Sequence, residues 1–284
     1  MLTKKEVGEL SIFSFQIKTE IVRMLAHLGV GHLGGSLSAT DLLAVLYGRQ
    51  MRIDPKNPDW PERDWLVFSK GHSGPAVYAA LALKGYFPKE ELLTLNRPGT
   101  NLPSHCDRNK TVGIDMTTGS LGQGASTAAG IALAHKMDGR PNYTYLVLGD
   151  GECNEGQVWE MAMFAPQFRL DRLIAFVDYN RLMLDGPTKE IMDIGDVAQR
   201  FCAFGWYAQE IDGHDISAID TAITNAKEKS SGRPCMIVLN TVKGHGWSAV
   251  ENKASCHNMP LTGAQFEEAQ AEFAEKMRAF KEAV

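Results

Sequence analysis

Apolar and polar residues follow two alternating patterns along the second half of the chain. Short apolar runs, such as YTYLVLG, LIAFVDY and PCMIVLNTV, stop at polar or glycine residues. Between them lie longer segments in which apolar residues recur every three or four positions, as in HDISAIDTAITNAKEK. The short runs predict buried strands, and the longer segments predict helices with one apolar face.

From residue 143 onward these elements alternate regularly. The expected strands are 143–149, 173–179, 207–211 and 234–242, and the expected helices are 155–168, 193–204 and 214–229. Upstream we expect a long helix at 3–28, a helix opened by Ser38 and Asp41, the strand WLVFS and a glycine-rich helix from about Leu121. The stretch 261–284 is typical of a charged surface helix. Strand-helix alternation predicts an α/β fold with a mostly parallel central sheet and helices on both faces.

Composition and charge narrow the class of protein. The 284 residues are 44% hydrophobic and 22% charged, and no apolar run reaches the roughly 18 residues of a membrane span. The N-terminus lacks a signal-peptide pattern and the five cysteines are scattered, so we expect a cytoplasmic protein with reduced thiols. A formal charge of -5 without a Lys/Arg cluster argues against nucleic acid as a partner.

Two oxygen-bearing side chains come directly after neighbouring strands of the predicted sheet. Asp150 ends one strand, and Asn180 ends the next, 180 − 150 = 30 residues later. Because ligands collect at the carboxyl ends of parallel strands, we expect both oxygens at one edge of the sheet. A carboxylate and an amide oxygen, with a carbonyl from the turn NRL, form a set that Mg²⁺ or Ca²⁺ takes while leaving positions for phosphate oxygens.

The residues around Asp150 suit a phosphate ligand. Gly149 and Gly151 let a ligand approach the backbone closely, and a helix starting near Glu155 directs free amides at a negative group. Taken alone, the tripeptide GDG is also typical of a helix-capping turn.

The complete pattern resembles the motif of thiamine-diphosphate enzymes, in which GDG opens and an Asn closes a magnesium-diphosphate site. Further segments resemble the amino-terminal half of transketolase and occur in that family's order over roughly residues 20 to 260: GHLGGSLSATDLL, SKGHSGPAVYAAL, TTGSLGQG, GDGECNEGQVWE, VDYNRL and TVKGHG. The resemblance implies the thiamine-diphosphate-binding fold. It also implies a transferase that moves a two-carbon ketol group from a ketose, such as a sugar phosphate, to an aldose.

The resemblance also implies the roles of individual residues. Asp150, Asn180 and the carbonyl of Leu182 would hold the metal ion. The residues expected to contact thiamine diphosphate are Lys70, His72, Gly119, Ser120, Leu121, Gly122, Gly149, Asp150, Gly151, Glu152, Asn180 and His257.

Four histidines match positions that surround the reacting ketose in the family. These are His32, His72, His105 and His257, which would hydrogen-bond the developing oxyanion or relay protons. Composition alone would make His32 and His105 ordinary loop residues, and only the resemblance reverses that interpretation. We interpret His27, His135 and His214 as surface or core residues and give His245 no catalytic role.

The pyrimidine-binding half of transketolase has no counterpart in this chain. Glu155 matches the acid that bonds the catalytic glutamate of a neighbouring pyrimidine-binding domain, although an acid at a helix N-terminus is also favoured by the helix dipole. We therefore expect residues 1–284 to form one diphosphate-binding domain, the amino-terminal subunit of a split transketolase. A separate carboxy-terminal subunit would complete an α2β2 assembly.

Two other functions fit part of the pattern. An E1 subunit of a 2-oxo acid dehydrogenase also carries the GDG-to-Asn motif, but SKGH and GHLGG favour transketolase. A non-catalytic protein that retains the fold need not keep both Asp150 and Asn180. In the family that the chain resembles, the groups that bind a sugar phosphate lie largely in the half that has no counterpart here. The sequence is therefore compatible with ordinary, sulfonated and branched sugars.

Overall fold

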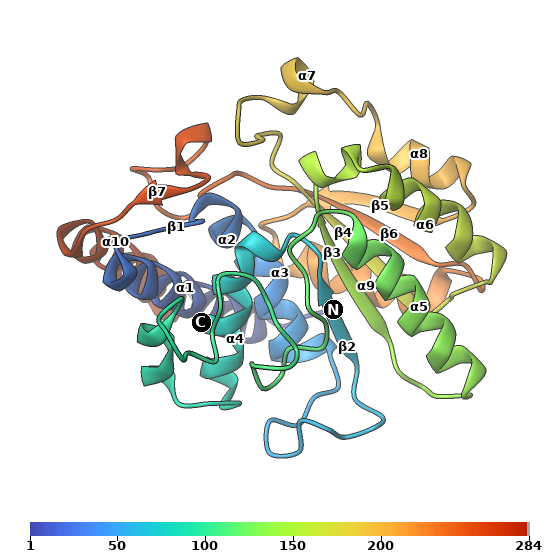
Figure 1. Cartoon of the computed structure of the whole chain (residues 1–284), viewed down its shortest axis with the longest axis horizontal. Coiled ribbons are helices and arrows are strands. Elements are labelled where there is room, and N and C mark those ends of the chain that lie inside the picture. Colours follow the sequence, from blue (N-terminus) through green and yellow to red (C-terminus); the bar gives the residue numbers. More distant parts are fainter. Residues whose placement is uncertain (283–284) are drawn as a thin grey trace.

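A parallel sheet with the strand order β2-β3-β4-β6-β5 forms the centre of the computed structural model, which describes residues 1–282 (Figure 1). Its strands are β2 (Trp65–Phe68), β3 (Thr144–Gly149), β4 (Leu173–Tyr179), β5 (Tyr207–Asp212) and β6 (Cys235–Asn240). Every neighbouring pair is parallel, so the carboxyl ends of all the strands lie along one edge. The predicted α/β fold with a parallel central sheet is therefore confirmed.

Helices cover both faces of this sheet, which explains why its strands are continuous apolar runs. The core on one face includes residues of α1 (Lys4–Leu28), α3 (Thr40–Val45), α4 (Gly74–Lys84), α9 (Ile216–Lys229) and α10 (Gly263–Glu282), the last of which packs on α1. The other face packs against α5 (Gln123–Met137), α6 (Gly156–Gln167) and α8 (Val197–Ala203). Alternate residues of β3 enter the two cores: Tyr145 and Val147 face the first, and Leu146 and Leu148 face the second.

The remaining elements are short and lie in the connections. They are the helices α2 (Gly34–Ser38) and α7 (Thr188–Ile191), the π-helix Leu46–Gln50, and the 3₁₀ turns Gly71–Ser73, Lys89–Thr94, Gly151–Asn154 and Ala254–Cys256. The strands β1 (Val30–Gly31) and β7 (Met259–Pro260) form a small antiparallel pair apart from the main sheet. Within residues 1–282, no helix is both long and apolar enough to span a membrane.

The C-terminal surface helix predicted for 261–284 is present as α10, from Gly263 to Glu282. α10 does expose a charged face, but it buries Ala269 and Phe273 against α1. The ring of Phe273 lies 5.8 Å from that of Phe15, and the ring of Phe280 lies 6.0 Å from it. Positions 283–284 of the prediction lie outside the described residues.

The segment after β4 departs from the prediction. A helix was expected over 193–204, but α8 begins only at Val197, because the Asp196 side chain caps it by accepting from the N–H of Gln199 at 2.8 Å. Gly195, in the left-handed region at φ +62°, precedes this cap. The short helix α7 was not predicted.

Candidate active site

The predicted metal ligands gather where β3 and β4 end side by side. The Asp150 carboxylate accepts from the N–H of Gly151 at 2.7 Å and from the N–H of Arg181 at 2.5 Å. The Asn180 side-chain oxygen accepts from the N–H of Leu182 at 3.1 Å. The Asp150 carboxylate therefore lies against the turn 180–182, which carries the two other predicted ligands, at the carboxyl edge of the sheet.

Asp150 is a buried carboxylate with an incomplete set of partners. Burial raises its pKa to about 6, and the nearby carboxylate of Asp178 adds to the shift, while the two main-chain donors oppose it. Among residues 1–282 it forms no ion pair. A cation at this carboxylate would offset the cost of burying its charge. Together with amide and carbonyl oxygens it forms the donor set that Mg²⁺ or Ca²⁺ takes, so the residues fit the predicted metal.

Lys70, a predicted cofactor contact, is engaged by the protein itself. Its buried ammonium pairs with Asp178 and donates to the carbonyl of Gly35 at 2.9 Å. Asp178 also accepts from the hydroxyls of Ser38 and Thr241. Burial alone would raise the pKa of Asp178, but Lys70 and the hydroxyls hold it below its usual value. In this arrangement, Lys70 anchors the end of β4.

Glu152 stays a predicted cofactor contact, and its side chain is engaged by the protein itself. The buried carboxylate accepts from the Ser69 hydroxyl at 2.5 Å, the Gly122 N–H at 2.8 Å and the Gly149 N–H at 3.0 Å. Protein donors thus occupy both oxygens. Glu152 ties together the ends of β2 and β3 and the turn before α5, which makes it a positioning residue for the segments around the site.

The four predicted histidines form one cluster. The ring of His32 lies 5.4 Å from His72, 6.2 Å from His105 and 5.4 Å from His257, and His72 lies 5.0 Å from His257. The pairing of Gly31 with Met259 between β1 and β7 brings His32 and His257 together from opposite ends of the chain. The fold therefore assembles imidazoles from four separate loops beside the carboxyl edge of the sheet.

The environment of three of these histidines, His32, His72 and His257, favours neutral imidazoles. Burial lowers the pKa of His72 to about 2, with Lys70 and the other histidines adding to the shift. Burial and the ammonium of Lys243 lower the pKa of His257 to about 4, and burial followed by His105 lowers that of His32. Neutral imidazoles can both donate and accept hydrogen bonds, as proton relays require.

The turn before α5 and the start of α6 form the outer wall of the site. Gly122 begins α5 at φ +81°, and a Cβ there would lie 2.8 Å from the Cβ of Glu155. Gly119 packs against the ring of His105, and Ser120 and Leu121 are exposed between them. Glu155 is the N-cap residue of α6, yet its side chain makes no capping hydrogen bond. Its exposed carboxylate is therefore available to a group outside the described chain.

Lys243 also lies at this site, although the sequence did not lead us to predict a role for it. Its buried ammonium donates to the carbonyls of Leu182 at 2.9 Å and Met183 at 3.0 Å, and it lies 3.2 Å from Nδ1 of His257. Burial lowers its pKa. The sequence feature that could have revealed it is its position in TVKGHG, just after the strand β6 that neighbours β4. Lys243 holds the carbonyl of Leu182, the third predicted metal ligand.

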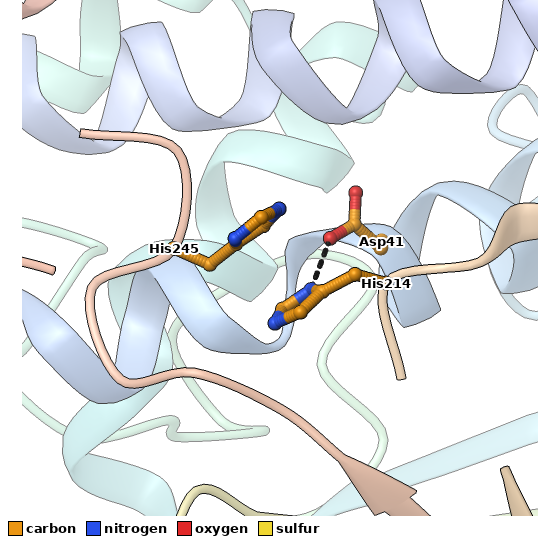
Figure 2. Close-up of side chains that lie close together, drawn as sticks. All are labelled: Asp41, His214 and His245. Atoms are coloured by element: carbon orange, nitrogen blue, oxygen red, sulfur yellow. Dashed lines mark hydrogen bonds and ion pairs between the residues drawn. The ribbon is translucent and has the colours of Figure 1, made fainter. Parts of the chain in front are cut away.

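A second group of polar residues lies beside the site, formed by Asp41, His214 and His245 (Figure 2). Nδ1 of His214 is 2.8 Å from Asp41, and its Nε2 accepts from the N–H of Val242 at 2.8 Å. With Nε2 accepting, Nδ1 carries the proton and has no lone pair for a metal ion. Lys18 also pairs with Asp41, at 3.3 Å. This group is a structural network, as expected for His214.

Comparison with known proteins identifies the family. Residues 16–281 match the family model described as "Transketolase, thiamine diphosphate binding domain". The chain belongs to the transketolase family. Its relatives are transferases, and it is the thiamine-diphosphate-binding subunit of an enzyme of this class.

Its transketolase relatives fall into two groups by length. The chain is 60% identical over 87% of its length to the 6-deoxy-6-sulfo-D-fructose transketolase subunit SqwG of Clostridium sp. strain MSTE9, covering 90% of that protein. It is 36% identical to an apulose-4-phosphate transketolase subunit of Phocaeicola vulgatus, covering 96% of both chains. It is 37% identical to human transketolase but covers only 39% of it.

Solved transketolase structures agree with this division. The structure of transketolase from Campylobacter jejuni matches with a TM-score of 0.87 and 28% identity, over 100% of this chain but 46% of that one. A transketolase from Pichia stipitis, solved with a bound sugar phosphate, matches with a TM-score of 0.84. This chain thus spans less than half the length of the solved transketolases that it matches.

Proposed function

We propose that the chain is the amino-terminal subunit of a split transketolase, active only with a separate carboxy-terminal subunit in an α2β2 assembly. The observation that carries this proposal is length: the chain covers 90% and 96% of two relatives named as subunits, but 39% of a transketolase made as one chain. The partner would supply the pyrimidine-binding half and close the cofactor site between the chains. The uncapped carboxylate of Glu155 would face that partner.

We assign the metal site to Asp150, Asn180 and the carbonyl of Leu182, with Mg²⁺ as the ion and Ca²⁺ as a substitute. The turn from Gly119 to Gly122 and the start of α6 would receive the cofactor's diphosphate. When bound, thiamine diphosphate supplies a nucleophilic carbon and an electron sink for the two-carbon group. Lys243 would supply positive charge near this position, whereas the charge of Lys70 is balanced by its pair with Asp178.

The histidine cluster would handle the protons of the reaction. His32, His72, His105 and His257 lie close enough to surround one sugar carbon, and the three whose pKa values are lowered are neutral at pH 7. As neutral bases they would take a proton from a substrate hydroxyl, and as donors they would bind the ketose oxygen as charge develops there.

For the donor we propose a ketose with a sulfonate at C6. The support is the 60% identity to SqwG, which is well above the 36% identity to the apulose-4-phosphate relative. A sulfonate carries one negative charge, whereas a phosphate monoester carries about 1.5 to 2 at neutral pH, so the two anions call for different countercharges.

The test is to co-express the chain with the carboxy-terminal transketolase subunit of its host and to record the intact mass by native mass spectrometry. Ketol transfer is then assayed with 6-deoxy-6-sulfo-D-fructose and with fructose 6-phosphate, each against the same aldose. We expect an α2β2 mass, activity only in the complex, and a kcat/KM at least about tenfold higher for the sulfonate donor.

Each part of the proposal can fail separately. Full activity in the pure chain would contradict the split arrangement. An active complex that prefers fructose 6-phosphate would keep that arrangement and overturn the donor.

A further inference from the structure

The network of Asp41, His214 and His245 contacts the main chain of the turn that follows β6. His214 stands in the turn between β5 and α9, and Asp41 belongs to α3. Figure 2 shows the His214 ring bonded to Asp41 through Nδ1 and facing the His245 ring. Its other nitrogen, Nε2, accepts from the N–H of Val242 at 2.8 Å. Val242 directly precedes Lys243, so the network reaches the candidate active site through the backbone.

Asp41 fixes the tautomer that this contact needs. Its buried carboxylate accepts from the Ser14 hydroxyl at 2.6 Å and pairs with the Lys18 ammonium at 3.3 Å. Burial alone would raise the pKa of Asp41, but Lys18 and His214 hold it below its usual value, so the carboxylate is charged. A charged acceptor keeps the proton of His214 on Nδ1 and leaves Nε2 free to accept from Val242.

The ring of His214 is held in place by a second imidazole. The ring of His245 stacks on it, with centroids 3.5 Å apart and an angle of 22° between the planes. Nδ1 of His245 lies 3.0 Å from the Glu251 carboxylate, which also accepts from the N–H of Gly246 at 3.0 Å. The stacked rings therefore hold the backbone of the turn 242–246 at two points.

Lys243 carries this backbone position into the site. Its buried ammonium donates to the carbonyl of Leu182 at 2.9 Å and lies 3.2 Å from Nδ1 of His257. Hydrogen bonds of this kind need about 2.7–3.2 Å, so a shift of about 1 Å in the backbone of Lys243 would disturb both contacts. A closely packed side chain has few other conformations with which to compensate. The ring of His214 is thus coupled to the carbonyl of Leu182, the proposed metal ligand.

We propose that His214 and Asp41 are positioning residues for the transketolase reaction. They hold the backbone at Val242, and this keeps the Lys243 ammonium against the carbonyl of Leu182. The inference rests on the proposed function, because it takes the metal site as assigned there. It adds two residues that act through a neighbouring turn and not by contact with the reacting groups.

The experiment compares two replacements of His214 in the full chain, co-expressed with the carboxy-terminal subunit of its host. In His214→Asn the amide nitrogen can still donate to Asp41, but the side chain is too short to reach Val242. In His214→Gln the longer amide can accept from Val242. Calorimetry measures Mg²⁺-dependent binding of thiamine diphosphate to each complex. We expect affinity to fall about tenfold or more in His214→Asn and less than about threefold in His214→Gln. Equal losses in the two variants would contradict a role for the contact with Val242.

A double-mutant cycle tests whether His214 acts through Lys243. Lys243→Met removes the ammonium and should weaken cofactor binding at least as much as His214→Asn does. The double variant His214→Asn/Lys243→Met should then bind within about twofold of Lys243→Met alone, because both changes break the same chain of contacts. The matched control is His135→Asn, which changes another buried imidazole, at the amino-terminal edge of the sheet. Its loss of affinity should stay below about twofold.

A second measurement uses the full chain alone. Nitrogen-15 NMR of the His214 ring at neutral pH should show a protonated Nδ1 and an unprotonated Nε2. The opposite tautomer would mean that Nε2 does not accept from Val242, and it would overturn the inference. Thermal unfolding of each variant checks that the fold is intact, and affinities are compared per folded protein.

The outcomes separate the positioning role from the function on which it rests. If the wild-type complex does not bind thiamine diphosphate with Mg²⁺, the proposed site fails and the inference fails with it. If Lys243→Met weakens binding but His214→Asn binds as tightly as the wild type, only the positioning role is wrong. Additive losses in the double variant would also overturn it, because His214 would then act by another route.

Discussion

Two buried aspartates at opposite edges of the sheet are satisfied in different ways. Asp64, just before β2 at the amino-terminal edge, accepts from the Arg52 guanidinium at 3.1 Å and from the N–H groups of Arg52 at 2.9 Å and Tyr143 at 2.8 Å. Asp150, after β3 at the carboxyl edge, accepts from two N–H groups and, within residues 1–282, has no cation partner. The described chain supplies both hydrogen-bond donors and a countercharge to Asp64, whereas it supplies only hydrogen-bond donors to Asp150.

This difference separates a structural group from a functional one. A buried carboxylate that keeps its charge without a countercharge destabilises the fold, so it persists where something that binds supplies the missing cation. At the amino-terminal edge the chain supplies that cation itself. At the carboxyl edge Lys70 is already committed to Asp178, which leaves Asp150 for a metal ion.

The largest effect should be the loss of cofactor affinity when the Asp150 carboxylate is neutralised. In Asp150→Asn, loss of the proposed ligand charge should weaken Mg²⁺-dependent binding of thiamine diphosphate at least about 100-fold, since even outer-shell changes cost 10- to 100-fold. Titration calorimetry on the assembled enzyme would measure this. Asp193→Asn, an exposed acid outside the metal turn, serves as the control. Wild-type affinity in Asp150→Asn would remove this residue from the metal site.

Removing the Asp64 carboxylate should instead lower the stability of the fold. Asp64→Ala would leave the buried N–H of Tyr143 without its acceptor and Arg52 without its partner, at a cost of about 2–3 kcal/mol in the free energy of unfolding. Urea unfolding measures the loss, and the exposed Asp59→Ala should change stability by less than about 0.5 kcal/mol. Cofactor affinity in the folded fraction should stay within about twofold; a large loss of affinity would mean that the two edges are not independent.

Glu152 tests whether a buried acid at the carboxyl edge can also be structural. In Glu152→Gln an amide nitrogen would face one of the donors Ser69, Gly122 or Gly149, so the segments around the site would shift. We expect cofactor affinity to fall about 10- to 30-fold, with about 1–2 kcal/mol less stability. The exposed Glu160→Gln should leave both unchanged. A loss of stability with unaltered cofactor affinity would mean that Glu152 stabilises the fold but does not position the site.

The smallest effect is a dependence of stability on pH. Asp150 has a pKa raised to about 6 in the folded chain against an ordinary value of 3.8, so the folded state holds this proton more tightly. Raising the pH from 5 to 7 should therefore destabilise the metal-free chain, by about 1 kcal/mol from this group. Comparing wild type with Asp150→Asn by thermal unfolding at each pH isolates the contribution. An identical pH dependence in the two proteins would contradict the raised pKa.

The fold followed from the sequence because its main signals are local. β4 spans the predicted 173–179, and the capping box of Thr3 and Glu6 opens α1 where a long helix was expected. The placement of Asp150 and Asn180 at one edge follows from the rule that the carboxyl ends of parallel strands share an edge, whereas the strand order was not predicted. Family motifs then located the histidines, whose cluster depends on contacts between loops far apart in the sequence.

The directions of side chains and the capping residues of helices could not be predicted from the sequence in this way. Spacing places Glu152 near the cofactor but does not tell which donors its carboxylate meets. Lys243 stands in a quoted motif, yet only the fold brings its ammonium to the carbonyl of Leu182. The buried face of α10 is formed by its contact with α1. The charges of α10 predict a surface helix but do not show which residues face α1.

The packing of α10 on α1 has a consequence for synthesis of the protein on the ribosome. Phe15 emerges before its partner Phe273, which follows 273 − 15 = 258 residues later. At about 5–20 residues per second, the apolar side of α1 waits roughly 10 to 50 seconds for its cover. α3 and α4 are made early and cover other parts of α1, so only its α10-facing side stays exposed for most of translation, an apolar surface to which chaperones near the ribosomal exit can bind.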